Sequence, residues 1–300
     1  MLCYNGGMKM RVAMLPVVVA LLAVSCRQEE KPREPETPQE MYEEVRRLLQ
    51  PNVEHDASDF GQAMVWLRRA AEGGLLQAQT DLGGIYLQGG KGGVKPDGRE
   101  AFHWFSKAAE QGNKESLYYL GYILHRGVDM PRDEARALDY WRRAAEGEVA
   151  EAQLALGAAL TQRAESAPEG VQWLIRAAAQ PVPKVAAQAS CALGNIYATG
   201  KHGVQRDMGE AARWYELAAR GGDAPAQLVY AIMLLQGDPL PQDTKQGLVF
   251  LRLSAGQDNP QAIALLVNLL RNGQATPTAE GEAEAWMARL EKLRPTPSAD

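Results

Sequence analysis

The feature that most constrains this sequence is an internal repeat. An aromatic residue, called here the repeat aromatic, is followed four positions later by two small residues. Such periodicity is typical of arrays of short packed units, so the 300 residues need not divide into separate globular domains. The copies are Trp66…Ala70-Ala71, Trp104…Ala108-Ala109, Tyr140…Ala144-Ala145, Trp173…Ala177-Ala178, Trp214…Ala218-Ala219 and Phe250…Ser254-Ala255, with a weak seventh at Trp286.

A second motif places a small residue four positions before Leu-Gly and returns every 36 to 38 residues. The spacing of four puts both positions on one face of a helix, where the small side chains allow close packing. We therefore expect a first helix in each unit that packs tightly through this face. The copies are Ala78…Leu82-Gly83, Ser116…Leu120-Gly121, Ala152…Leu156-Gly157 and Ala189…Leu193-Gly194, which decay to Ala226…Tyr230-Ala231 and Ala262…Leu266-Val267.

A third motif is an Asp or Ser seven residues before each repeat aromatic. Asp and Ser are favoured N-caps, because their side chains accept a hydrogen bond from the first helical turn. Ser166 followed by Glu169 also fits a capping box. The pattern predicts a second helix in each unit, ending near the paired small residues. The predicted caps are Asp59, Asp97, Asp133, Ser166, Asp207 and Asp243.

These three motifs predict an all-α fold in which each unit is a helical hairpin. Taken together in the segment Ala78–Asn113, they closely resemble the Sel-1-like repeat, a tetratricopeptide-like helical hairpin. The resemblance implies a right-handed α-solenoid of about seven antiparallel hairpins. We assign it to residues 39–292, with a first helix over 39–50, an irregular unit around 164–184 and a short tail at 293–300.

The N-terminus has the pattern of an export signal. Lys9 and Arg11 precede an apolar run of 13 residues, Val12–Val24, which is shorter than the roughly 20 residues of a membrane-spanning helix. The run ends in Leu-Ala-Val-Ser before Cys26, which resembles a bacterial lipobox. The resemblance implies cleavage of residues 1–25 and lipidation of Cys26, although an ordinary cleaved signal with a chance cysteine is the alternative.

Residues 26–38 combine the lipidated cysteine with a charged, proline-rich stretch, RQEEKPREPETP. A segment without large apolar residues does not fold by burial, so we expect a flexible tether. Arg27 follows the cysteine, and the resemblance to sorted lipoproteins then implies the outer membrane, with the folded body facing the periplasm.

We find no catalytic constellation in the sequence, and we expect no metal, no cofactor and no enzymatic activity. The net charge of -5 and the lack of a basic tract argue against nucleic-acid binding. Cys191 is expected to be a small core filler. Some Sel-1-like proteins with cysteines in every repeat bind or hydrolyse β-lactams, so an envelope hydrolase is the alternative reading. The three cysteines here do not follow the repeat.

Protein recognition remains the favoured function. The face of each first helix that points away from its partner helix should line a groove, and Tyr and Arg are common at the energetic centres of protein interfaces. On this face we predict a protein-binding site at Tyr118, Tyr122 and Arg126, with Asn195 at the equivalent face of a later unit. The sequence thus predicts a membrane-anchored scaffold for protein partners in envelope assembly or maintenance.

Overall fold

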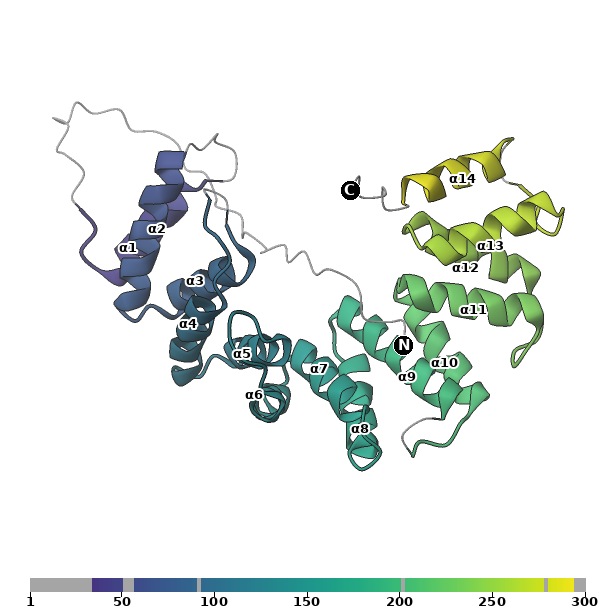
Figure 1. The fold of residues 1–300 in the computed structure, drawn as a ribbon, viewed down its shortest axis with the longest axis horizontal. Helices are drawn as coiled ribbons and strands as arrows, with labels where there is room; N and C mark the ends of the chain where they lie inside the picture. Colours follow the sequence, from purple (N-terminus) through teal and green to yellow (C-terminus); the bar gives the residue numbers. More distant parts are fainter. Residues whose placement is uncertain (1–33, 51–56, 91–92, 201–202, 278–279, 294–300) are drawn as a thin grey trace, which may run out of the picture. The chain divides into compact units, whose positions relative to one another are not determined.

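A computed structural model describes residues 34–50, 57–90, 93–200, 203–277 and 280–293, and all regular structure in these ranges is helical (Figure 1). Read in order, the helices form seven successive pairs, which confirms the predicted all-α repeat fold. We call the odd-numbered helices A helices and the even-numbered ones B helices. They are α1 Pro38–Leu48, α2 Ala57–Glu72, α3 Leu76–Gln88, α4 Gly98–Glu110, α5 Lys114–Arg126, α6 Glu134–Glu146, α7 Ala150–Leu160, α8 Ala167–Ala178, α9 Pro183–Thr199, α10 Met208–Arg220, α11 Ala224–Gln236, α12 Thr244–Gly256, α13 Pro260–Arg271 and α14 Glu282–Lys292.

The predicted signal peptide, Cys26 and most of the tether lie outside the described residues, as does the tail from residue 294 on. In the part that is described, no helix is both long enough and apolar enough to cross a membrane. The chain divides into two compact units, residues 1–137 and 138–300, and the boundary falls within α6.

The first unit begins with the helix that was expected over residues 39–50. It is observed as α1, and Thr37 caps it in a reciprocal capping box with Glu40. Tyr42 of α1 donates a hydrogen bond to Asp81 of α3 at 2.5 Å. Burial, followed by this contact with Asp81, raises the pKa of Tyr42 above its ordinary value. This bond joins α1, in the first hairpin, to α3, in the second hairpin.

The glycine of the Leu-Gly motif allows the A and B helices of one hairpin to touch. A Cβ at Gly83 would lie 2.9 Å from the ring of Phe105, and one at Gly194 would lie 2.8 Å from the ring of Tyr215. Phe105 and Tyr215 each follow a repeat aromatic directly and are only 2% and 3% exposed. The residue after the repeat aromatic thus fills the space against the A helix.

Most of the predicted helix caps are present. Backbone N–H groups of the first turn donate to the carboxylates of the predicted residues at α4, α6, α10 and α12. One prediction is wrong: helix α2 starts at Ala57, so Asp59 lies inside its first turn and is not the N-cap. Ser166 is the N-cap residue of α8, as predicted, but the expected capping bond is absent, because its hydroxyl donates to the carbonyl of Leu160 at 2.7 Å. The confirmed capping residues are Asp97, Asp133, Asp207 and Asp243.

Buried glutamines connect successive helices through side-chain hydrogen bonds. Gln227 of α11 donates to the carbonyl of Ala219 in the preceding B helix at 3.1 Å. Its own carbonyl accepts a bond from Gln257, just after α12, at 2.9 Å. A buried amide must satisfy both its donor and its acceptor, so this pairing fixes the register between neighbouring helices. The same pairing recurs at Gln79 with Gln111 and at Gln153 with Gln180.

Candidate protein-binding surface

The three residues predicted as a binding centre lie along α5 in the first unit. Tyr118 is buried, with 8% of its surface exposed, and packs edge-on against Tyr119 with ring centres 5.1 Å apart. Tyr122 is half-buried and Arg126 is exposed in the last helical turn. The structure therefore places all three on one helix, but Tyr122 and Arg126 offer most of the accessible surface. Their role in binding stays a prediction.

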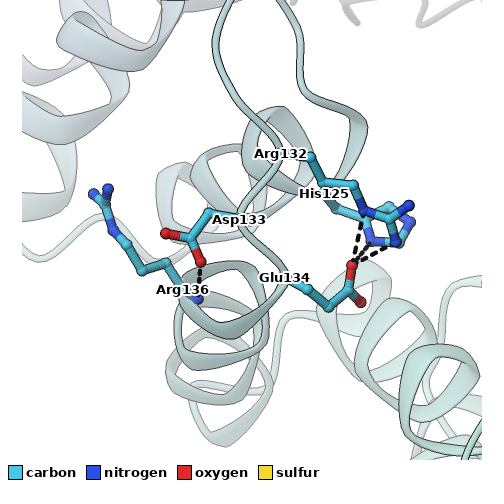
Figure 2. A network of polar contacts seen from close by, with 5 residues as sticks. All are labelled: His125, Arg132, Asp133, Glu134 and Arg136. Atoms are coloured by element: carbon cyan, nitrogen blue, oxygen red, sulfur yellow. Dashed lines mark hydrogen bonds and ion pairs between the residues drawn. The ribbon is translucent and has the colours of Figure 1, made fainter.

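A polar network that includes His125, the residue before Arg126, lies where α5 passes into α6 (Figure 2). His125 Nδ1 is 3.0 Å from Glu134 Oε2, and Arg132 donates to the same oxygen at 2.6 Å. Burial opposes ionisation of Glu134, but the hydrogen bond from Arg132 and the contact with His125 outweigh it. Together they hold the pKa of Glu134 below its ordinary value. The network fixes the loop that follows Arg126.

Asn195 lies on α9 in the second unit. Its side-chain oxygen accepts a hydrogen bond from the Tyr215 hydroxyl at 2.8 Å, and its amide nitrogen lies 3.8 Å from the Cys191 sulfur. Cys191 is only 2% exposed, which fits the predicted core filler. The thiol also contacts Asp223, whose pKa is raised by burial. Asn195 is half-buried and takes part in this internal chain, so it offers a partner less surface than the sequence suggested.

Successive B helices share a recurring contact that the sequence motifs did not predict. In three places a glutamate accepts a hydrogen bond from the repeat tryptophan four residues later. The same glutamate pairs with an arginine of the preceding B helix. Each glutamate thus ties its own tryptophan to the neighbouring repeat. The triads are Arg68–Glu100–Trp104, Arg142–Glu169–Trp173 and Arg252–Glu282–Trp286.

A second recurring feature covers the repeat aromatics. In five B helices a cationic side chain three residues after the repeat aromatic lies over its ring. The distances from cation to ring centre run from 4.6 Å at Arg176 to 5.7 Å at Arg143, within the range of a cation–π interaction. The sequence carried the signal for this feature, an aromatic followed at i+3 by Arg or Lys. The pairs are Trp66 with Arg69, Trp104 with Lys107, Tyr140 with Arg143, Trp173 with Arg176 and Trp286 with Arg289.

Metal-ligating side chains do not gather in the part of the chain that the structure describes. No group of three His, Cys, Asp or Glu residues there could hold a metal ion. The recurrent polar contacts instead join helices and cap helix ends. The surface left for other molecules consists of helix side chains that do not take part in packing between the repeats.

Comparison with known proteins identifies the repeat. The Sel1 repeat family model matches residues 54–75, 76–113, 114–148, 150–182, 187–223 and 224–259, which is more than half of the chain. The chain belongs to the Sel1 repeat family. Five matched segments each hold all or most of an A helix and the whole of the B helix that follows, whereas 54–75 holds α2 alone. A Sel1 repeat scaffold is suited to protein–protein interaction.

Two solved structures share this Sel1 fold. A protective antigen present in uropathogenic Escherichia coli strains is 30% identical, with a TM-score of 0.70 over 85% of this chain and 53% of the other. A Sel1 repeat protein from Oxalobacter formigenes has the same TM-score at 24% identity, covering 84% of this chain and all of the other. The second likeness shows the fold alone.

Curated relatives are fungal regulators. The chain is 34% identical over 170 residues to the chitin synthase regulator SKT5 of Saccharomyces cerevisiae. It is 33% identical over 84 residues to chitin synthase regulatory factor 3 of Schizosaccharomyces pombe. The matches span 54% and 28% of this chain, but only 24% and 9% of the relatives. The chain thus matches a minor part of each relative.

Proposed function

We propose that this Sel1 repeat protein is a membrane-anchored adaptor that faces the periplasm and binds protein partners through its A helices. The observation that carries the proposal is the surface of α5, where Tyr122 and Arg126 are accessible beside one another on consecutive turns. Tyrosine and arginine supply large contact area and directed hydrogen bonds at interfaces. Tyr118, one turn earlier on α5, is largely buried, and Asn195 is a separate candidate on the second unit.

The comparisons support an adaptor because the curated relatives are regulatory proteins. The fungal relatives are named as regulators of chitin synthase. Recognition by repeats uses the side chains left free on successive helices. A role in envelope assembly or maintenance follows if the chain is exported and held at the outer membrane through Cys26.

Cross-linking in intact cells, followed by quantitative identification of co-purified proteins, tests the binding surface. We expect a small set of partners with the wild type, and at least a tenfold loss of them with a Tyr118→Ala/Tyr122→Ala/Arg126→Ala variant. Arg163→Ala, which changes an exposed arginine between α7 and α8, is the control. Normal recovery with the triple variant contradicts the assignment of the site.

Membrane fractionation tests the anchor separately. Changing Cys26 to alanine removes the only predicted acylation site. The Cys26→Ala variant should therefore appear in the soluble fraction. Unchanged membrane association of Cys26→Ala rules out the proposed lipid anchor. Turnover of an envelope substrate such as a β-lactam by the purified chain would favour the hydrolase alternative over the adaptor.

A further inference from the structure

Two consecutive B helices depart from the pattern of covered aromatics. At the position three residues after the repeat aromatic, five B helices carry Arg or Lys over the ring, but α10 carries Leu217 and α12 carries Leu253. Leu217 is 56% exposed and Leu253 is 49% exposed. Val249, four residues before Leu253, is 56% exposed. The second unit therefore presents large apolar side chains where the repeat otherwise places a cation.

Helix α10 has also lost the glutamate contact of its tryptophan. Glu210 stands four residues before Trp214, but its carboxylate pairs with Arg213 at 2.7 Å. The buried Nε1 of Trp214 has no hydrogen-bond acceptor among the described residues. Both contacts that cover or tie the repeat tryptophan elsewhere are therefore missing from α10. The departure involves more than a single substitution.

The charged residues one helical turn from these apolar side chains are basic. Arg213 and Arg220 flank Leu217 four residues before it and three after it, and Lys245 stands four residues before Val249. The exposed Asp207 and Asp243 lie farther away, at the N-caps of α10 and α12. Arg213 is 78% exposed while its partner Glu210 is 38% exposed. Arg220 is 64% exposed against 36% for Glu216. Helix α12 contains no Asp or Glu, and its Lys245 is exposed. These flanking positive charges lie on a chain whose formal net charge is -5.

We propose that Leu217, Val249 and Leu253 form a docking surface for an amphipathic helix of a partner protein that carries Asp or Glu beside its apolar stripe. The i, i+4 spacing of Val249 and Leu253 matches the spacing of side chains on a docked helix. Acidic side chains beside the stripe meet Arg213, Arg220 and Lys245. We call Leu217, Val249 and Leu253 the leucine surface. It is carried by B helices, and so differs from the A-helix site proposed above.

Charge argues for a different protein over a second copy of this chain. A second copy brings the same exposed arginines and Lys245 to the interface, where like charges repel. An acidic partner helix gains from the same groups. An anionic membrane is the other surface that a basic, apolar face attracts, and the experiment below separates it from a protein.

The test uses a photo-activated cross-linking residue at position 249 of the full chain, in cells that produce it naturally. Val65 is the matched control, because it also directly precedes a repeat aromatic and is 45% exposed. A companion variant, Leu217→Arg/Leu253→Arg, restores the cation that five other B helices carry. It is therefore expected to fold, which thermal unfolding checks. Mass spectrometry then identifies the cross-linked segment.

We expect cross-links from position 249 to a helical segment of one protein, with apolar residues at spacings of three or four and flanking Asp or Glu. Their yield should fall at least tenfold in the double variant, and position 65 should not give the same product. The proposal is overturned by products with a second copy or with lipid, by a segment of another chemistry, by no product, or by a yield that the double variant leaves unchanged. Loss of the α5 site does not affect these products.

Discussion

Gly83 and Phe105 lie in direct contact within one hairpin: a Cβ at Gly83 would come 2.9 Å from two carbons of the Phe105 ring. Real Cβ atoms do not approach so closely, so the hairpin depends on the missing side chain. The neighbouring Gly84 has nothing within 4 Å of such a Cβ. Of these two adjacent glycines of α3, only Gly83 is therefore required by packing.

Gly83→Ala should destabilise the protein by about 1–3 kcal/mol, because the added methyl group overpacks the contact with Phe105. Gly84→Ala should be neutral, or stabilising by up to about 1 kcal/mol, because alanine is the better helix former. Urea unfolding followed by circular dichroism measures both. Equal effects of the two changes would argue against tight packing at Gly83.

Gln227→Ala should destabilise the second unit by about 1–3 kcal/mol. The change removes the hydrogen bond to Ala219 and leaves the amide of Gln257 without its acceptor at Gln227. Gln261→Ala is the matched control, since Gln261 is exposed on α13 and should change stability little. Urea midpoints compare the two variants, and a Gln227→Ala midpoint like that of the control would contradict the proposed register bond.

Glu169 should make stability depend on pH. The hydrogen bond from Arg142 lowers the pKa of Glu169 below its ordinary value of 4.5, against an opposing effect of burial. A carboxyl with a depressed folded-state pKa stabilises the fold above its ordinary pKa, and this stabilisation is lost as the pH falls through the lowered value. Thermal unfolding of Glu169→Gln from pH 6 to pH 3 should therefore show a weaker acid-induced loss than wild type.

Because Glu169 is 46% exposed, solvent and salt should screen this contribution. The difference between Glu169→Gln and wild type should shrink in concentrated salt. The control is Glu165→Gln, because Glu165 forms no ion pair with a basic residue among the residues that the structure describes. An identical acid response of Glu169→Gln and wild type would show that the Arg142 pair contributes nothing.

Leu217→Arg should raise stability by about 0.5–1 kcal/mol, because the new guanidinium can cover Trp214 as Arg176 covers Trp173 at 4.6 Å. The reverse change, Arg176→Leu, should lower stability by a similar amount. Differential scanning calorimetry compares the two variants with wild type. If Leu217→Arg were destabilising, the cation position would not be transferable between repeats.

Much of the fold could be predicted from the sequence, because the repeat encodes it locally. Paired small residues, Leu-Gly and four of the Asp caps each report on contacts within one hairpin. The cap prediction fails at Asp59, because helix α2 begins two residues before it. Ser166 stands at the predicted N-cap of α8, but its hydroxyl bonds to Leu160 in place of the helix end.

The candidate surface was less predictable, because exposure depends on neighbouring helices. Tyr118 stands at a free position of the repeat, yet it is buried against its surroundings, including Tyr119. Asn195 is engaged by Tyr215, twenty residues away in sequence. The Arg–Glu–Trp triads join residues 27 to 32 positions apart, and single helical patterns do not reveal such pairs.

The most direct test of the adaptor account is hydrogen–deuterium exchange of the purified chain, alone and with a partner captured by cross-linking. The account predicts that the partner slows exchange in peptides covering α5, Lys114–Arg126, and that Tyr122→Ala/Arg126→Ala abolishes this protection. Protection confined to other helices, or protection of α5 that persists in the variant, would contradict the proposed binding surface.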